Sequence, residues 1–264
     1  FKVIYGMEAY LVDDLKDIVT NSKGQKLDCA CVVFDIETTG FSPVADKIIE
    51  IGAVRVEDGK IVGRFSTFVN PKTPIPFRIE TLTHINDSMV MDAPTIETVL
   101  PEFMKFCKDA VMVAHNAGFD MSFIERNCQL QGIQREFTVA DTVAMARFLL
   151  PGLIRFKLDR VAKAVGASLE NHHRAVDDAE GTAQIFVKFL KMMEERDIFD
   201  LDQLNQQGKV SENTVRKLPT YHAIVLAKNE TGRVNLYRMV SESHLKYYNR
   251  RPRLPKSVYL KYQE

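Results

Sequence analysis

The chain has 264 residues, and its 35 basic residues balance 35 acidic ones, so any electrostatic attraction to a partner must be local. This length allows one large domain, or one ordinary domain with appended segments. No apolar run approaches the ~18 residues of a membrane helix, and the first residues lack the pattern of a signal peptide. We therefore expect a cytoplasmic protein with no membrane partner. The four cysteines have neither zinc-ribbon nor CxxC spacing and are expected as reduced core residues.

The beginning of the chain predicts a short strand and then a connecting segment. Residues 1–12 are typical of a strand with a turn at Gly6, whereas residues 13–28 are polar and rich in turn formers, as in a linker. From residue 29 the chain becomes strand-like, first in CACVVFDIE and then in a long β-rich stretch. The Asp58-Gly59 pair in that stretch is typical of a hairpin turn.

The middle of the chain is dominated by predicted helices. Apolar periodicity indicates a short strand at residues 110–114 and helices at residues 95–107, 119–131, 142–150, 157–165 and 175–196. Strands followed by alternating helices predict an α/β or α+β fold in which helices cover a sheet.

The last part of the chain, residues 199–264, predicts a polar linker followed by a separate piece. Between residues 246 and 264 it carries six basic residues against one acid, with four tyrosines among them. Basic and aromatic residues together are typical of single-stranded nucleic-acid binding. A packed or surface segment of a larger domain is the alternative.

Two acids end the first predicted strand of the central part. In FDIETTG, residues 34–40, side chains alternate, so Asp35 and Glu37 point to the same side about 7 Å apart along the backbone. Like charges at the end of a buried strand are unfavourable unless something positive lies between them. A hard cation such as Mg²⁺ or Mn²⁺ suits an all-oxygen site, and a loop cap or a Lys or Arg partner is the alternative. Gly40 is free to take a positive φ, which would let the chain turn away at this point.

Two further segments supply acids and a histidine. Asp120, which ends AHNAGFD, shares a helix face with apolar residues, so its carboxylate should start on the buried side. In NHHRAVDDAEG the apolar positions of the helix place Asp178 inward and Asp177 toward solvent. His173 is expected on the loop before this helix, where it could swing over the site. An imidazole with a pKa near ~6.5 suits a general base.

FDIETTGF with KIIEIGAVRV, then AHNAGFD, then HRAVDDA resemble, in order, the three exonuclease motifs of the DEDDh (DnaQ-like) 3′-5′ exonucleases. The resemblance covers about residues 29–195 and implies an RNase H-like fold, with a central mixed β-sheet and helices on its faces. It implies two divalent ions, Mg²⁺ or Mn²⁺, in each active site. The implied ligands are Asp35, Glu37, Asp120 and Asp178, with His173 as base. The expected substrate contacts are Thr38, Leu82 as a wedge, Asn116, and Phe119 as a stacking platform.

The two ends of the chain resemble pieces of the PHP domain of bacterial family C DNA polymerases. The carrying stretches are VIYGMEAYLVDD and the segment that starts at PTYHAIVLAK. In PolC-type polymerases an exonuclease domain interrupts the PHP domain, which implies a PHP-derived segment and linker at 1–28, an exonuclease domain at 29–198, and a linker and PHP-derived segment at 199–264. Glu8 and His222 fall where that family has metal ligands. The six histidines contain no HxH pair, so no complete PHP metal site is expected.

Together, these resemblances imply a Mg²⁺-dependent proofreading exonuclease that is part of a bacterial replicative DNA polymerase. It would release nucleoside 5′-monophosphates from mispaired or single-stranded DNA 3′ ends. Its expected partners are those DNA ends and the remaining domains of the polymerase and replisome. The alternatives are a stand-alone RNA-trimming exonuclease and a non-catalytic module that binds DNA ends or joins subunits.

Overall fold

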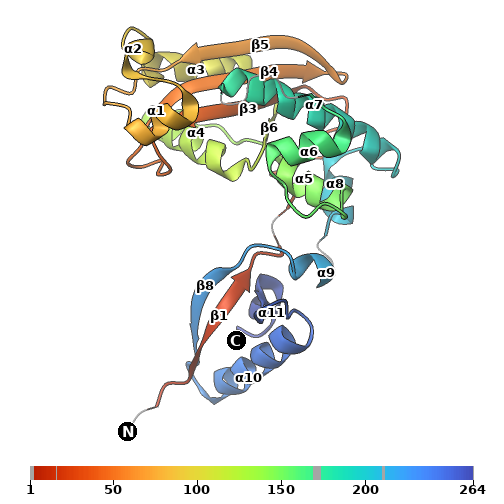
Figure 1. Cartoon of the computed structure of the whole chain (residues 1–264). Coiled ribbons are helices and arrows are strands. Elements are labelled where there is room, and N and C mark those ends of the chain that lie inside the picture. Colours follow the sequence, from red (N-terminus) through yellow and green to blue (C-terminus); the bar gives the residue numbers. More distant parts are fainter. Residues whose placement is uncertain (1–2, 16, 169–173, 210–211, 264) are drawn as a thin grey trace. The chain divides into compact units, whose positions relative to one another are not determined.

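The computed structural model describes residues 3–15, 17–168, 174–209 and 212–263, and the chain forms two compact units (Figure 1). The larger unit is Ile18–Gln207, and the smaller one combines Phe1–Asp17 with Gly208–Glu264. The predicted boundaries at residues 29 and 198 both lie inside the larger unit.

The larger unit is built on a six-stranded mixed sheet with the strand order β2-β7-β6-β3-β4-β5 (Figure 1). The central strand β3 pairs in parallel with β6 and antiparallel with β4. Asp58 and Gly59 connect β4 to β5 with φ angles of 48° and 68°, which confirms the predicted hairpin turn. The bounds are β2 (Val19–Thr20), β3 (Cys31–Thr38), β4 (Ile48–Glu57), β5 (Lys60–Phe68), β6 (Val111–Ala114) and β7 (Val139–Asp141).

Helices cover both faces of this sheet, as expected for an RNase H-like fold (Figure 1). One face packs against α3 (Ile96–Phe106) and α4 (Gly118–Leu130). The other packs against α5 (Thr142–Leu149), α6 (Leu158–Val165) and α7 (Ala175–Glu194). At one end of the unit, α1 (Phe77–Thr83) and α2 (Asp87–Val90) form a smaller apolar cluster with β4.

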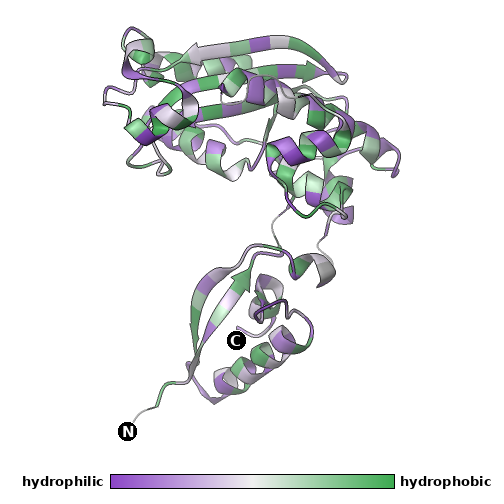
Figure 2. Cartoon of the chain, viewed as in Figure 1, coloured by the Kyte–Doolittle hydropathy of each residue, from purple (hydrophilic) through white to green (hydrophobic). Residues whose placement is uncertain are grey.

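Alternate residues of β3 enter the two cores. Val32 and Phe34 pack on the side of α3 and α4, whereas Cys31 and Val33 pack on the side of α7. Because the side-chain period of a strand is two, Asp35 and Glu37 emerge on the face that α7 covers. The edge strand β5 contains both hydrophobic and hydrophilic residues, which Figure 2 shows as green and purple segments along the strand.

Two segments expected as linkers contribute to the folded units. Within residues 13–28, β2 pairs with β7 at the edge of the sheet. The polar stretch after residue 198 contains α8 (Leu201–Gln207), whose Leu201 and Leu204 are buried in the core, and the short α9 (Glu212–Val215). The expectation of a linker there was wrong because two well-placed leucines are enough to anchor a short helix. Within the described part of the chain, no helix has the length and apolar character needed to cross a membrane.

The smaller unit joins the two ends of the chain. Its three-stranded sheet has the order β8-β1-β9, and β1 pairs antiparallel with β8. One face packs on the helices through Ala9, Met239, Leu254 and Val258. The bounds are β1 (Gly6–Val12), β8 (Tyr221–Leu226), β9 (Leu254–Pro255), α10 (Glu230–Leu245) and α11 (Lys256–Lys261).

Candidate active site

Three carboxylates meet at the end of the central strand. One oxygen from each of Asp35, Glu37 and Asp178 lies within 4.8 Å of the others. Asp35 and Glu37 come from β3, and Asp178 comes from the first turn of α7. None of the ion pairs between described residues involves Asp35 or Glu37, so protein cations do not balance these two acids.

Burial and mutual repulsion disfavour the charged forms of these acids. Burial above all, and then the charges of Asp120, Glu37 and Asp178, hold the pKa of Asp35 well above its usual range. Burial also raises the pKa of Glu37 to about 8, with further contributions from nearby acids. Carboxylates that repel one another in a buried place fit a hard divalent cation, which prefers oxygen ligands and supplies the missing positive charge. The residues present therefore fit a metal ion.

Asp120 lies close to this cluster but outside the group of three. It is only 3% exposed at the start of α4, and burial raises the pKa of its carboxyl to about 7. Its charge raises the pKa of both Asp35 and Glu37. The turn before α4 is fixed by Asn116, which has a φ of 68° and donates its backbone N–H to Asp141 Oδ1 at 3.1 Å.

The start of α7, which carries Asp178, is attached to β4 by an ion pair between the half-exposed Arg174 and the buried Glu50. Glu50 pairs with Glu37 across the strands and is 1% exposed. Its carboxylate accepts hydrogen bonds from Arg174 Nη2 at 2.7 Å and from the backbone N–H of Ala175 at 3.1 Å. The Arg174 guanidinium also lies 5.0 Å from the centre of the Phe68 ring. Glu50 thus holds the first turn of α7 beside the cluster.

A glycine on β4 lets the same helix start approach the sheet. Gly52 lies opposite Asp35 in the strand register. A Cβ at Gly52 would meet the backbone of Ala175 and Val176 well inside 3.0 Å, a separation that real Cβ atoms essentially never reach. The absence of a side chain at residue 52 therefore allows α7, and with it Asp178, to lie directly over β3 and β4.

His172 and His173 both lie outside the described residues, so the prediction of His173 as base is neither supported nor contradicted by the geometry. His115 is the described histidine nearest to the acids in sequence, at the end of β6. Its Nδ1 is 2.9 Å from Thr142 Oγ1 and its Nε2 is 2.8 Å from the carbonyl oxygen of Phe156. Burial lowers the pKa of His115. With both nitrogens engaged and its charged form disfavoured, His115 is poorly suited to act as the base.

The predicted substrate contacts occupy different environments. Thr38 is buried and its hydroxyl donates to the carbonyl oxygen of Gly40 at 2.6 Å. Leu82 on α1 is 52% exposed, and Asn116 is exposed. Phe119 is half-buried, and its ring lies 6.3 Å from that of Phe41, which is 74% exposed. Phe41 and Phe119 thus form an aromatic edge next to two of the motifs that supply the acids.

The structure gives a different reason for glycine at residue 40 than a positive φ. Gly40 does not have a positive φ, unlike Gly59. A Cβ at Gly40 would instead lie 2.5 Å from the carboxylate of Asp46. That carboxylate accepts the backbone N–H of Ser42 at 2.8 Å. Glycine is therefore needed for the close approach of the Asp46 side chain that closes the loop after β3.

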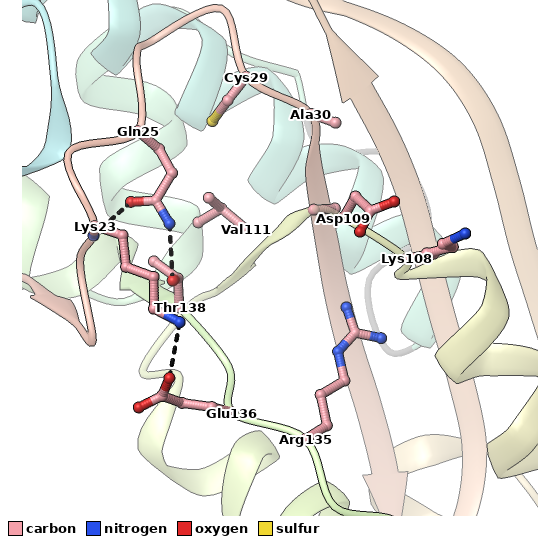
Figure 3. Close-up of a pocket in the computed structure, with 11 residues that line it drawn as sticks. Lys23, Gln25, Cys29, Ala30, Lys108, Asp109, Val111, Arg135, Glu136 and Thr138 are labelled. Atoms are coloured by element: carbon pink, nitrogen blue, oxygen red, sulfur yellow. Dashed lines mark hydrogen bonds and ion pairs between the residues drawn. The ribbon is translucent and has the colours of Figure 1, made fainter.

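A polar cavity of about 560 Å³ lies elsewhere in the larger unit (Figure 3). It is next to Ala30 and Val111, at the beginnings of β3 and β6, whereas the acids are at the end of β3. Lys23 pairs with Glu136 at 2.8 Å there, and Arg135 donates to the carbonyl oxygens of Met104 and Cys107. None of the clustered acids lines this cavity, so it is not the candidate active site.

Glu8 and His222 lie together on the exposed face of the smaller sheet. His222 Nδ1 is 2.7 Å from Glu8 Oε1, and both side chains are mostly exposed. They are not among the residues that could form a group of three or more metal ligands in the described part of the chain. Glu8 and His222 therefore contact each other, but among the described residues they do not form a metal site.

Three residues that the sequence prediction gave no role help to build the site. Glu50 and Gly52 stand in the apolar run IIEIGAV, where an acid and a glycine are both unusual for a buried strand. These two unusual residues could have been recognised from the sequence. The partner Arg174 could not be inferred, because the pairing depends on how α7 crosses the sheet.

Comparison with known proteins identifies the class. The profile of the family described as "Exonuclease" (RNase_T) matches residues 32–186, which is more than half of the chain. The chain belongs to this exonuclease family. Among solved structures it is similar to "Exonuclease X in complex with 5′ overhanging duplex DNA", with 29% identity and a TM-score of 0.53, over 67% of this chain and 99% of that one. The nuclease domain of 3′hExo, a DEDDh family member bound to rAMP, has a TM-score of 0.54 at 20% identity, over 64% of this chain and 94% of that one, and supports the fold.

The closer sequence relatives are larger proteins. The chain is 54% identical over its whole length to "DNA polymerase III PolC-type" of Clostridium perfringens, of which it covers 18%. It is 49% identical to the protein of the same name from Caldanaerobacter subterraneus, of which it covers 19%. The chain thus spans about a fifth of the length of these relatives, and the similarity includes both units.

Proposed function

We propose that the chain is the 3′-5′ proofreading exonuclease portion of a PolC-type DNA polymerase III. It would remove nucleoside 5′-monophosphates from mispaired or single-stranded DNA 3′ ends. The observation that carries this proposal is the cluster of Asp35, Glu37 and Asp178 within 4.8 Å, in a chain that matches PolC-type polymerases over its whole length. The expected partners are the DNA end and the remaining parts of the polymerase, and the expected location is the cytoplasm.

The acids are proposed to hold two Mg²⁺ ions, which Mn²⁺ could replace. Asp35, Glu37 and Asp178 would hold one ion, and Asp35 and Asp120 would hold the other. When bound, such ions lower the pKa of an attacking water and stabilise the charge on the departing 3′ oxygen. The acids themselves gain from this arrangement, because the ions offset the repulsion that raises the pKa of Asp35 and Glu37.

The proton of the attacking water is proposed to go to His173, which precedes α7 by two residues. A histidine is suited to this step because its ordinary pKa lies near neutral pH. The Glu50–Arg174 pair is placed directly after His173 and orders the first turn of α7.

The substrate end is proposed to rest on the aromatic edge of Phe41 and Phe119, since stacking on aromatic rings accepts any base. Leu82 would act as a wedge against the terminal base, while Thr38 and Asn116 would contribute polar contacts. A mispaired end frays more readily than a paired one. An active site that accepts only unpaired ends therefore selects errors.

The smaller unit is proposed to be two joined pieces of a PHP domain. Pairing of β1 with β8 across the exonuclease insertion supports one common origin for both ends. The exposed face of this sheet carries Ile224 (78% exposed) and Leu226 (62% exposed), which suit packing against further protein. Glu8 and His222 would be remnants of a PHP metal site.

The test is a time course on a primer with a mismatched 3′ nucleotide, labelled at its 5′ end, with Mg²⁺ and then with chelator. Stepwise shortening from the 3′ end with release of 5′-monophosphates, stopped by chelator, is expected. A matched RNA oligonucleotide is the comparison, and faster degradation of RNA would favour an RNA-trimming enzyme. Tight end binding without any cleavage in Mg²⁺ or Mn²⁺ would favour the non-catalytic alternative.

A further inference from the structure

The zero net charge of the chain conceals two oppositely charged units. The smaller unit contains 14 Lys and Arg against 8 Asp and Glu, a formal charge of +6. The larger unit contains 21 against 27, a formal charge of −6. Since DNA is a polyanion, the larger unit alone offers little long-range attraction to it. Of the two units, only the smaller one has more positive than negative charges.

Within the smaller unit, lysines and arginines near the end of the chain differ in their partners. Lys246 and Lys261 pair with Glu242 at 3.5 and 3.1 Å, and Lys256 lies 3.8 Å from Asp13. In contrast, none of the four arginines here forms an ion pair with a carboxylate of the described residues. These four, which we call the arginine patch, are Arg216, Arg250, Arg251 and Arg253.

Hydrogen bonds hold the arginine patch together. Arg216 Nε donates to the carbonyl oxygen of Lys246 at 2.7 Å, and Asn249 Nδ2 donates to the carbonyl oxygen of Arg216 at 2.7 Å. The Arg253 guanidinium donates to the carbonyl oxygen of Asn249. The Arg251 guanidinium lies 4.6 Å from the centre of the Tyr10 ring. The guanidinium groups of Arg216, Arg251 and Arg253 are thus positioned by the fold, and Arg250 lies in the same turn of the backbone.

One member of the patch, Arg253, has a polar group that the fold leaves unsatisfied. The Nε–H of Arg253 is buried and has no hydrogen-bond partner among the described residues. Burial and the positive charge of Arg251 lower the pKa of Arg253. Guanidinium groups that lack a carboxylate partner and repel each other are unfavourable, and an anion bound beside them would offset that repulsion.

We propose that the arginine patch binds the phosphodiester backbone of the DNA whose 3′ end the larger unit cleaves. The identity of the DNA rests on the proposed function. Arginine matches phosphate oxygens with two parallel hydrogen bonds. Tyr248, 53% exposed and within 3.4 Å of the Arg250 carbonyl oxygen through its hydroxyl, adds a ring on which a base can stack.

The test measures equilibrium binding of the 264-residue chain to a fluorescein-labelled single-stranded DNA, by anisotropy in chelator so that no cleavage occurs. The variant is Arg250→Gln with Arg251→Gln. The matched control is Lys209→Gln with Lys228→Gln, which removes the same charge from exposed positions of the same unit. A third protein, Arg250→Lys with Arg251→Lys, keeps the charge and reports on whether the guanidinium geometry matters. Circular dichroism verifies the fold of each variant.

Loss of two phosphate contacts should lower the slope of log K against log salt by about 1.4 and weaken binding by roughly 25-fold at 0.1 M salt. The control should change far less, and the lysine variant should keep most of the slope. Equal effects of the arginine variant and the control would overturn the proposal. Binding is measured without metal, so the two proposals can fail separately. Equal salt slopes for the arginine variant and the control, with intact nuclease activity, contradict only this inference. Normal DNA binding without any nuclease activity contradicts the proposed function.

Discussion

Gly52→Ala should damage the active site without touching any acid. The new Cβ would lie closer to the backbone of Ala175 and Val176 than the ordinary contact distance of 3.4 Å, by about 1 Å or more. The first turn of α7 must therefore move away from β4. Asp178 lies three residues beyond Ala175 and must move with it. Overpacking of this kind costs about 1–3 kcal/mol of stability. A 1 Å displacement of a catalytic group can cost about 10²-fold in rate.

The assay is the rate of nucleotide release from a 3′-mismatched primer at saturating Mg²⁺, with thermal unfolding of the same preparation. Gly63→Ala is the matched control, because a Cβ at Gly63 on β5 would lie 3.5 Å from its nearest neighbour, in Phe106, an ordinary contact. We expect Gly52→Ala to lose about two orders of magnitude in rate, and Gly63→Ala to remain near the unchanged protein. Equal rates and equal melting temperatures for the two variants would refute the argument that α7 rests on Gly52.

Three further predictions concern the surroundings of the acids. Glu50→Ala should lower stability by about 1–3 kcal/mol, because it leaves the backbone N–H of Ala175 without its buried acceptor, while water can solvate the half-exposed Arg174 guanidinium; chemical denaturation measures this, and no measurable loss would contradict it. His173→Ala should reduce the rate at saturating Mg²⁺ far more than the Mg²⁺ affinity, whereas His172→Ala should change little; the reverse pattern would show that the wrong histidine was chosen. In the metal-free protein, the raised pKa of Glu37 means that its contribution to stability is fully present below its unfolded pKa of 4.5 and is lost as the pH rises through about 8. Melting temperatures should therefore fall across this range without metal and recover with Mg²⁺ at pH 8, and no metal-induced recovery would count against a cation among these acids.

The sequence predicted much of this architecture because the signals are local. The helices at α3 to α7 agree with their apolar periodicity to within one or two residues, and strand alternation placed Asp35 and Glu37 on one face. Helix periodicity also favoured Asp178 over Asp177, and Asp178 is the acid that meets the other two. Each of these inferences needed only residues a few positions apart.

The rest depends on contacts between distant segments. Glu50 and Arg174 are 124 residues apart, so their ion pair could not be predicted from the sequence around either residue. Val19 and Thr20 form a strand only because β7 offers an edge, and a two-residue strand has no periodicity to detect. The charge division between the units was also hidden, because the smaller unit combines residues from both ends of the chain.

The central claim is that Asp35, Glu37 and Asp178 form a cation site for cleavage at a DNA 3′ end. The most direct measurement is anomalous diffraction from crystals of the chain soaked in Mn²⁺. Strong peaks should lie among these three carboxylates. Asp178→Ala should abolish the peak of the Mn²⁺ ion that Asp178 coordinates, while the fold is retained. Mn²⁺ peaks elsewhere in the larger unit, with none between these acids, would contradict the account.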